Sequence, residues 1–456
     1  MIYGKEAMSL TSFFIRKAVA PLWAYHERSP YLKISRDLKV HEQISLDERL
    51  SRQWDQLVKM VGHAWAKCPY YRCRFGQTGF QPGMLKSWED LKRLPILTKD
   101  DIRENTATMI AQGEKEENLI PRKTSGSTGV SLNFYVKDSE FQFKRGVTLY
   151  RDEWTGWKLG DWRAMVWGNP TYLVNWRSRI RNNLLERMFS LDTLKMNEAM
   201  MHDFSKKIMT KKPTLLFGHA HSLYLFADYC KKQDYPLYPF KGILSTAMVL
   251  HDHERTLCEE VFRTRVFNRY GCEEVSLIAS ECELHDGLHI NTDNLIVEIL
   301  KDGREAEPGE EGQLVITDLT NLAMPFLRYQ MGDLAVPSSK RCPCGRTYPL
   351  LERLAGRVAD YLLTPEGEWV SGISLTENFA TLIPGLKQIQ IIQNQRERIL
   401  LRMVKGEEFG ESSLEEIKRL IKNRFGPRMD YTLEFVERLF PEPSGKYRFS
   451  ICNLHD

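Results

Sequence analysis

The chain has 456 residues, enough for roughly two to four domains of about 100–200 residues each. Its 42% apolar and 27% charged content is that of a globular protein, and 64 basic against 60 acidic residues give no electrostatic reason to expect a nucleic-acid partner. No run approaches the roughly 20 apolar residues of a membrane span, and residues 1–16 lack the apolar block of a signal peptide. Nine cysteines, an odd number, argue against a secreted disulfide framework, so we expect a reducing, cytoplasmic setting.

The first predicted elements are helical. Apolar residues recur at helical spacing over residues 46–61, and Cys68-Pro69 ends that helix. An extended stretch from Leu94 then leads into a helix with Thr98 as its N-cap. Short apolar strands next alternate with helical stretches, which predicts an α/β fold with a layered core. The expected strands are 164–167, 214–217, 242–245 and 265–268, and the expected helices are 197–210, 222–232 and 251–262.

After Asn268 the pattern becomes richer in β-strands. Residues 295–300 and 312–317 alternate, and the turns Asp302-Gly303 and Pro308-Gly309 indicate antiparallel hairpins. From about Gly356 a smaller α+β segment follows, with strands expected at 388–393, 398–404 and 431–436 and a helix at 413–424. We therefore expect a large N-terminal domain, residues 1–355, and a small C-terminal domain, residues 356–456.

The first motif with chemical meaning is a loop rich in hydroxyl groups and glycine. Its glycines let the backbone turn tightly and expose N–H groups, which together with the hydroxyls suit phosphate oxygens. The Gly-Lys-Ser/Thr ending of a P-loop is missing, and on composition alone a surface turn explains the loop better than a binding site does. The residues of the loop are Thr124, Ser125, Gly126, Ser127, Thr128 and Gly129.

The motifs that follow this loop occur in a recognisable order. They are Tyr270-Gly271-Cys272-Glu273-Glu274, Pro325–Asp333, Gly356–Asp360 and Pro443-Ser444-Gly445-Lys446. In this order the sequence resembles the adenylate-forming superfamily of acyl-CoA ligases. Cys68–Arg72 and Leu94–Arg103 resemble its phenylacetate–CoA ligase branch, which includes CapK-like relatives from capsule biosynthesis. The resemblance covers residues 60–450 and implies that the C-terminal domain is mobile and hinged near Asp360.

The resemblance also implies a site for ATP and Mg²⁺. The loop of residues 124–129 would hold the β- and γ-phosphates, and Glu274 would coordinate Mg²⁺, which favours oxygen ligands. Tyr270 would lie beside the adenine, and Asp333 would accept hydrogen bonds from the ribose. Lys446 would reach the α-phosphate and the acyl carboxylate during adenylation. The other residues implied at the nucleotide site are Asn268, Gly271, Arg357 and Asp360, with Arg328 a candidate for closing it.

Two departures from the family pattern concern the substrate and the acceptor. Met248 follows Ser245-Thr246-Ala247 where many relatives have Glu, and residues 361–367 lack the glycine-rich continuation that serves the thioester-forming state. Adenylation is therefore better supported than CoA as the final acceptor. His219 and His221 have two interpretations, as lining of an acyl pocket or as helix-capping and packing residues.

A separate group of residues has the pattern of a zinc site. Cys342 and Cys344 lie on one turn, and an earlier segment carries Cys282 with His285 and His289. Two thiolates from one turn, with a Cys and a His from another, would complete a tetrahedral Zn²⁺ site. His285 has the better spacing to Cys282, but either histidine could be the fourth ligand. Because the superfamily's chemistry uses Mg²⁺, we expect the zinc to be structural. The alternative is that the cysteines are reduced and only have packing roles.

The motifs together predict an AMP-forming acid–thiol ligase resembling phenylacetate–CoA ligase. A carboxylic acid, expected to be aryl or a related small acid, would form an acyl-adenylate and then pass to the CoA thiol. One alternative is an adenylating transferase that delivers the acyl group to an amine, polysaccharide or carrier. Another is a non-catalytic, zinc-stabilised binding protein, against which Glu274, Asp333 and Lys446 together argue. The sequence leaves open the identity of the acid and the oligomeric state, a homodimer included.

Overall fold

The structure is a computed structural model, and it describes the chain with several gaps. The described residues are 10–123, 132–167, 176–193, 196–236, 240–357, 361–367, 369–371, 379, 382–440, 448 and 450–454. The loop of residues 124–129, Asp360 and Lys446 lie outside them. Within the described part, no helix is both long enough and apolar enough to cross a membrane.

The described elements alternate between helices and strands in the first half and are richer in strands in the second. The α-helices are α1 (Leu10–Phe14), α2 (Ala20–His26), α3 (Tyr31–His41), α4 (Leu46–Lys67), α5 (Pro69–Thr78), α6 (Lys99–Met109), α7 (Asp138–Asp152), α8 (Trp176–Arg181), α9 (Glu198–Lys211), α10 (Ala220–Lys232), α11 (Asp252–Phe262) and α13 (Glu411–Phe425). The first strands are β1 (Ile120–Lys123), β2 (Asn133–Val136), β3 (Arg163–Val166), β4 (Met188–Leu191), β5 (Leu215–His219), β6 (Gly242–Thr246), β7 (Val266–Cys272), β8 (Ser276–Ser280), β9 (Leu288–Ile290) and β10 (Leu295–Lys301). The remaining strands are β11 (Arg304–Glu305), β12 (Gly312–Asp318), β13 (Tyr329–Pro337), β14 (Leu350–Arg357), β15 (Tyr361–Leu363), β16 (Trp369–Ser371), β17 (Leu386–Gln395), β18 (Arg398–Lys405), β19 (Asp430–Phe435) and β20 (Ser450–Cys452).

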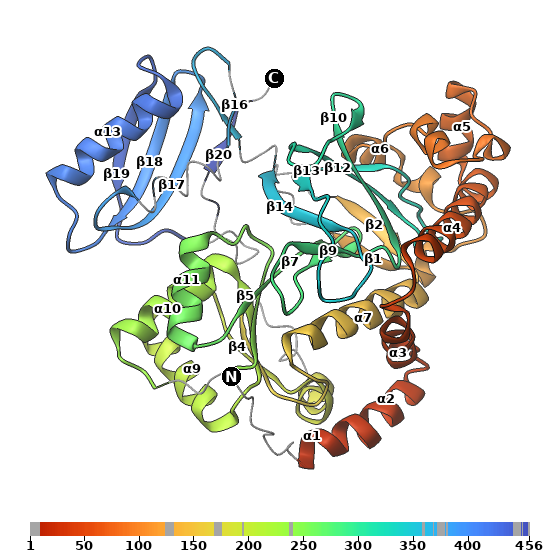
Figure 1. Ribbon diagram of the computed structural model, residues 1–456, viewed down its shortest axis with the longest axis horizontal. Helices are drawn as coiled ribbons and strands as arrows, with labels where there is room; N and C mark the ends of the chain where they lie inside the picture. The colour runs from red at the N-terminus through yellow and green to blue at the C-terminus, as the bar shows by residue number, and fades with distance from the viewer. Residues whose placement is uncertain are drawn as a thin grey trace.

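A sheet of twelve strands forms the centre of the large N-terminal part (Figure 1). Its order is β11-β10-β12-β13-β14-β9-β8-β7-β6-β5-β3-β4. Strands β4, β3, β5, β6 and β7 pair in parallel, and the others pair antiparallel. The parallel strands are continuous apolar runs because both faces of this part of the sheet are buried. The mixed α/β fold predicted from the sequence is confirmed.

Helices cover both faces of the parallel strands. Alternate residues of a strand point to opposite faces. Leu216 therefore packs in one cluster with Phe204 of α9 and Phe226 of α10, while Phe217 packs in another with Leu149 of α7. Figure 1 shows α9, α10 and α11 gathered on one side of β4 and β5. This arrangement leaves the carboxyl ends of the parallel strands at one edge of the sheet, where ligands bind in open α/β sheets.

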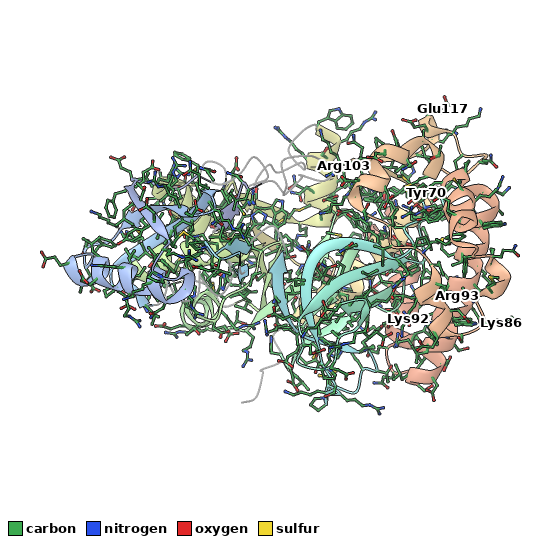
Figure 2. The ribbon with its side chains drawn as sticks, turned by 90° about the horizontal axis from the view of Figure 1, so that it is seen from above. Tyr70, Lys86, Lys92, Arg93, Arg103 and Glu117 are labelled. Carbon is green, nitrogen blue, oxygen red and sulfur yellow. The ribbon has the colours of Figure 1, made fainter. Side chains whose placement is uncertain are left out.

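The N-terminal helices form a layer of their own. Helices α4, α5 and α6 share a core with the antiparallel strands β10, β12 and β13. Thr98 caps α6, and its side chain accepts a hydrogen bond from the Asp101 amide, as its position in the sequence predicts. Cys68-Pro69 ends α4, as predicted, and the structure adds that Pro69 begins α5 at once, since its missing N–H is not needed in a first turn. Figure 2 shows Tyr70, Lys92 and Glu117 on this layer, at the end of the molecule opposite the four-stranded sheet.

A four-stranded sheet with α13 makes up the C-terminal part (Figure 1). Its order is β19-β18-β17-β20, and the alternating apolar residues of β17 and β18 pack against one face of α13. The last strand of the large sheet ends at Arg357, and β15 begins at Tyr361. The domain boundary at residues 355 and 356 remains a prediction.

Candidate functional site

The predicted nucleotide-binding residues lie where β7 ends beside the antiparallel strands. Tyr270 is in β7, and its hydroxyl donates a hydrogen bond to Oδ2 of Asp333 in β13. Asp333 is 5% exposed, and Gly332 before it has φ = +84°, a backbone conformation that favours glycine. The residue opposite Asp333 in the β13–β14 pair is Arg357. The structure thus brings together three residues that the sequence separates by up to 87 positions, counted from 270 to 357.

Glu274 lies directly after β7 and is almost fully buried. One of its carboxylate oxygens accepts a hydrogen bond of 3.0 Å from the Tyr329 hydroxyl. The ammonium of Lys144 lies 3.4 Å from the backbone oxygen of Glu274 and forms its ion pair, 2.8 Å long, with Asp318 instead. Among the described residues, no Lys or Arg side chain forms an ion pair with the Glu274 carboxylate. A buried carboxylate in this position suits a metal cation, because an unpaired buried charge is costly.

Two further polar atoms at this edge have no hydrogen-bond partner among the described residues. They are Oγ of Ser245 in β6 and Oδ1 of Asn268 in β7, which stand opposite each other in the strand pair. Buried polar atoms are usually satisfied, so these two are candidates for ligand contact. Asn268 was predicted from the resemblance. Ser245 was not assigned a role in the sequence, although it lies in the segment that departs from the family pattern.

Arg328 differs from its prediction as a residue that closes the nucleotide site. It is 5% exposed, and both ends of its guanidinium bind Glu298 at 2.9 and 3.0 Å. Its remaining nitrogen donates to the backbone oxygens of Lys92 and Leu94. Its backbone φ is +48°, in the left-handed region. These contacts join the N-terminal helical layer to the large sheet, so they give Arg328 a structural role and no support for a catalytic one.

His219 is the last residue of β5, and His221 lies in the first turn of α10. Nδ1 of His221 lies 2.9 Å from Oε1 of Glu254, and both side chains are buried. Burial opposes ionisation of Glu254, but the His221 hydrogen bond and the nearby histidine charges hold its pKa below the ordinary value. Nε2 of His221 lies 3.4 Å from Nε2 of Gln388 in β17, a contact between the two parts of the chain. His219 packs against Trp167. Both histidines thus have packing contacts, and His221 also faces the C-terminal sheet.

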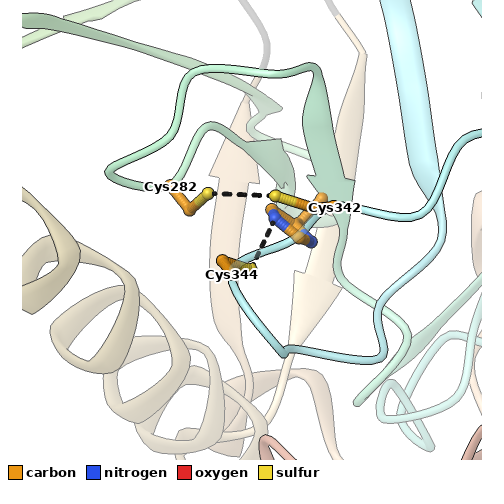
Figure 3. A group of neighbouring side chains, drawn as sticks. Cys282, Cys342 and Cys344 are labelled. Atoms are coloured by element: carbon orange, nitrogen blue, oxygen red, sulfur yellow. Dashed lines mark hydrogen bonds between the residues drawn. The ribbon is translucent and has the colours of Figure 1, made fainter.

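The predicted cysteine and histidine residues converge on a second site (Figure 3). The ligand atoms of Cys282, His289, Cys342 and Cys344 all lie within 4.8 Å of one another. The Cys282 and Cys342 sulfurs are 3.6 Å apart, and the Cys344 sulfur is 3.5 Å from Nε2 of His289. Tetrahedral zinc with Zn–S of about 2.3 Å and Zn–N of about 2.0 Å has ligand separations of about 3.8 Å between two sulfurs and 3.6 Å between sulfur and nitrogen, close to these two distances.

The surroundings of this cluster set the charge and the outer hydrogen bonds of its ligand residues. Burial raises the pKa of Cys282 to about 12, so the thiol is protonated as long as no metal is bound. Burial and two neighbouring arginines lower the pKa of His289 to about 3, so the ring is in the neutral form that binds metals. The Leu284 and Arg346 amides donate to the sulfurs of Cys282 and Cys344 at 3.5 and 3.4 Å. Such outer hydrogen bonds are typical of ligands to a metal.

The two histidines considered as the fourth ligand, His285 and His289, lie in different surroundings. His289, in β9, is part of the cluster, and the spacing that favoured His285 is overruled. Nδ1 of His285 lies 3.1 Å from Oε2 of Glu281, and its ring packs 4.5 Å from that of Phe267. The backbone of His285 has a left-handed φ of +56°. Sequence spacing alone could not anticipate that local turn.

Sequence reasoning missed a cavity next to the nucleotide residues. It has a volume of about 320 Å³ and reaches Cys272 and Glu273 of the Tyr270–Glu274 motif. One face of α7 lines it with residues at helical spacing, which are Phe141, Lys144, Arg145, Thr148, Leu149 and Asp152. The charges in this segment were visible in the sequence, but nothing there showed that they face a cavity.

Comparisons with known proteins show which families the sequence resembles. The CapK C-terminal domain model matches residues 362–453. Over 371 residues the chain is 25% identical to the protein CapK of Staphylococcus aureus, covering 80% of this chain and 81% of that protein. It is 26% identical over 335 residues to the phenylacetate–coenzyme A ligase of Thermus thermophilus, covering 68% and 71% of the two chains.

Solved structures extend the likeness to the whole fold. A 2-hydroxyisobutyryl-CoA ligase in the postadenylation state, in complex with 2-HIB-AMP, aligns with a TM-score of 0.74 at 21% identity over 90% of this chain and 91% of that one. The same ligase in the thioesterification state gives a TM-score of 0.61. The predicted resemblance to the adenylate-forming superfamily, with its CapK and phenylacetate–CoA ligase relatives, is therefore confirmed.

Proposed function

We propose, from this resemblance to the adenylate-forming superfamily, that the protein activates a carboxylic acid with ATP and Mg²⁺ and then transfers the acyl group to the thiol of CoA. The observation that carries the proposal is the convergence of Tyr270, Asp333 and Glu274 at the end of β7. In the sequence these residues belong to two separate motifs. Two buried carboxylates beside the carboxyl ends of the parallel strands support a nucleotide site there.

The proposed roles follow from charge and hydrogen bonding. Asp333 would accept the ribose hydroxyls, with Tyr270 holding its carboxylate in place. Glu274 would hold Mg²⁺, which supplies neutralisation of the phosphate charge that builds up during adenylation. Lys446 would stabilise the α-phosphate and the acid carboxylate, as the motif match implies. Activation is needed because a free carboxylate has no good leaving group, whereas an adenylate releases AMP.

The relatives support this class of reaction. Several are named phenylacetate–coenzyme A ligases, at 24–26% identity. The 2-hydroxyisobutyryl-CoA ligase was solved with an acyl-AMP and with CoA. Its acid is a small hydroxy acid, while phenylacetate is an aryl acid. The relatives therefore support a carboxylic acid as the substrate, but they do not agree on its type.

Pyrophosphate release tests the proposal. The protein is incubated with ATP, Mg²⁺ and a panel of aryl, aliphatic and hydroxylated acids, with and without CoA. We expect acid-dependent pyrophosphate release and, with CoA, a thioester and AMP. Glu274→Gln should lower the release by about 10²-fold or more, as loss of a charge-stabilising group does elsewhere. Glu311→Gln, which alters an exposed ion pair with Arg353, is the matched control. No release with any acid would contradict the proposal and favour the non-catalytic binding protein.

A different acyl acceptor is the second candidate function. The match of residues 362–453 to the CapK C-terminal domain favours it, because the C-terminal domain contributes to the acyl-transfer state in the resembled family. With hydroxylamine as the amine probe, an acyl hydroxamate should form faster than a CoA thioester forms if the acceptor is an amine. Thioester formation at the higher rate would favour CoA.

We also propose that Cys282, His289, Cys342 and Cys344 hold a structural Zn²⁺. All four positions of a tetrahedral ion would be filled by protein, which leaves none for a substrate. Metal analysis of the purified protein should find about one equivalent of zinc, released by a strong chelator together with a fall in stability. Less than about half an equivalent, with all four residues unmodified, would contradict this assignment.

A further inference from the structure

The first helix of the described chain carries an apolar face that points away from the core. Helix α1, the π-helical turn Ile15–Val19 and α2 follow one another without a break, and Figure 1 shows α1 and α2 in one row at the edge of the molecule, far from the four-stranded sheet. The inner face of this row packs in a core with residues of β5 and β6. The π turn takes up an extra residue, which brings the exposed side chains of α2 into line with those of α1. The most exposed of these outer side chains, at 62–86%, are Leu10, Phe14, Leu22 and Tyr25.

A second exposed segment, α8 with the π-helical turn Asn182–Glu186, lies against this row of helices. Leu185 of the second segment is buried in the same core as Ile15, and Arg181 forms an ion pair of 2.6 Å with Glu27 at the end of α2. The outward apolar side chains of the second segment recur every four residues and are 44–67% exposed; they are Trp176, Ile180 and Leu184. The two segments hold five of the seven most exposed large apolar side chains among the described residues. Such a group of exposed apolar side chains marks an interaction site.

The same two segments concentrate positive charge. Residues 10–28 and 176–187 include seven basic and two acidic residues, a net charge of +5, whereas the whole chain has +4. Each of the two acidic residues is paired with two arginines. Four of the basic residues are exposed and form no ion pair with any described residue; they are Lys17, Arg28, Arg177 and Arg179. The exposed residues of these two segments, here named the basic apolar surface, thus combine apolar side chains with positive charge that no described carboxylate offsets.

We propose that the basic apolar surface binds the face of a membrane that contains anionic lipid. Aromatic and aliphatic side chains insert among the headgroups, while Lys and Arg attract the negative phosphates, and a helix with both features lies in the plane of the interface. Trp and Tyr suit that depth because their rings are apolar at one end and polar at the other. A second copy of the chain fits less well, since a symmetric contact would bring two surfaces of net charge +5 together. Nucleic acid offers phosphates but no apolar layer for the leucine and phenylalanine side chains.

Sedimentation of the full chain with vesicles tests the proposal. One set of vesicles is phosphatidylcholine alone, and the other is phosphatidylcholine and phosphatidylglycerol in equal parts. We expect the protein to bind the anionic vesicles about 10-fold or more tightly than the neutral ones at about 0.1 M salt, and to lose about 10-fold or more of that affinity at about 0.5 M, because salt screens the attraction. Absence of binding to the anionic vesicles, or equal binding to both sets, would overturn the proposal.

A charge variant connects the binding to the second segment. Arg177→Gln with Arg179→Gln removes two exposed positive charges and should weaken binding to the anionic vesicles by about 10-fold or more. The matched control is Lys422→Gln with Arg424→Gln, which removes two charges at the same spacing from exposed positions of α13 and should change the binding by less than about two-fold.

An apolar variant connects the binding to the first segment. Phe14→Ser removes an exposed ring that would insert among the headgroups, and it should weaken the binding by about 10-fold. Phe440→Ser, at a ring that is 73% exposed in the C-terminal part, is the matched control and should leave the binding unchanged. All of these positions are exposed, so the melting temperature should change little in each variant.

Three further results would overturn the proposal. Binding to anionic vesicles that neither the charge variant nor the apolar variant weakens would assign it to another part of the molecule. A dimer in solution that Phe14→Ser dissociates, with no binding to vesicles, would identify a second copy of the chain as the occupant. Tighter binding to a DNA duplex than to anionic vesicles at the same salt concentration would identify nucleic acid. Pyrophosphate release is measured without vesicles, so the adenylating function stands or falls separately.

Discussion

The cysteine–histidine cluster and the proposed nucleotide site differ in how many of their residues neighbouring segments bring together. At the cluster, four donors from two turns and one short strand meet within 4.8 Å. At the nucleotide site, the described strands supply Tyr270, Glu274 and Asp333, while Lys446 belongs to the far end of the sequence. A site that only holds an ion can be closed by neighbouring segments. A site proposed to perform two reactions would need groups that arrive from the C-terminal part of the chain.

The largest effect that would test this difference is expected at Lys446. Lys446→Ala should lower adenylation by about 10²–10³-fold, because it removes a positive charge from the transition state. Acyl transfer from a supplied acyl-adenylate should be largely retained, since that step does not use the lysine. The two rates are measured separately as pyrophosphate release and thioester formation. Equal loss of both would contradict a domain that serves the two steps in different positions.

Loss of one ligand of the cysteine–histidine cluster should lower the stability of the protein without changing the rate of pyrophosphate release. Cys344→Ser should bring the zinc content well below one equivalent and lower the free energy of unfolding by about 2–4 kcal/mol, as loss of a stabilising ligand set does. The pyrophosphate rate per folded molecule should stay within about two-fold below the melting temperature. Cys73→Ser, at an exposed free thiol, is the control and should change neither zinc nor stability.

Substitution of Asp333 should weaken the binding of ATP and leave the metal cluster unchanged. Asp333→Asn keeps the shape and removes the charge, and charge-assisted hydrogen bonds contribute about 1.5–3 kcal/mol, so KM for ATP should rise by roughly 10–100-fold. Zinc content and the melting temperature should change little. The control is Asp302→Asn, at an exposed hairpin turn with φ = +51°, which asparagine tolerates. An unchanged KM for ATP would remove Asp333 from the nucleotide site.

The smallest expected effect concerns pH and the buried pair of His221 and Glu254. Because the folded-state pKa of Glu254 lies below its ordinary value of 4.5, its ionised form stabilises the fold at higher pH, and this contribution is lost as the pH falls below that value. Glu254→Gln should therefore lower stability near neutral pH and make less difference in acid. Chemical denaturation at several pH values measures this, with Glu260→Gln at an exposed pair as control. A difference that grew on acidification would have the wrong sign.

Local signals predicted much of the fold. The apolar runs of β5 and β6 and the cap of α6 at Thr98 depend on neighbouring residues, so they are readable from sequence. The contacts of Arg328 could not be read from the sequence, because its partner Glu298 is 30 positions away and is brought close only by sheet pairing. The cavity along α7 was missed for the same reason, since α7, β3 and the end of β7 meet only in the folded chain. At the cluster, the residue types were visible, but the choice between His285 and His289 depended on backbone geometry.

The position of the short strand β9 gives the metal cluster a mechanical consequence. β9 pairs through two residues with β8 and through two with β14, so it is the narrow junction between the two halves of the twelve-stranded sheet. His289 is in β9, Cys282 precedes it, and Cys342 and Cys344 precede β14. A bound ion would tie both sides of that junction together. We expect amide hydrogen exchange to show one cooperative unit in the metal-bound protein and two after chelation, with the earliest exchange at residues 288–290 and 350–351.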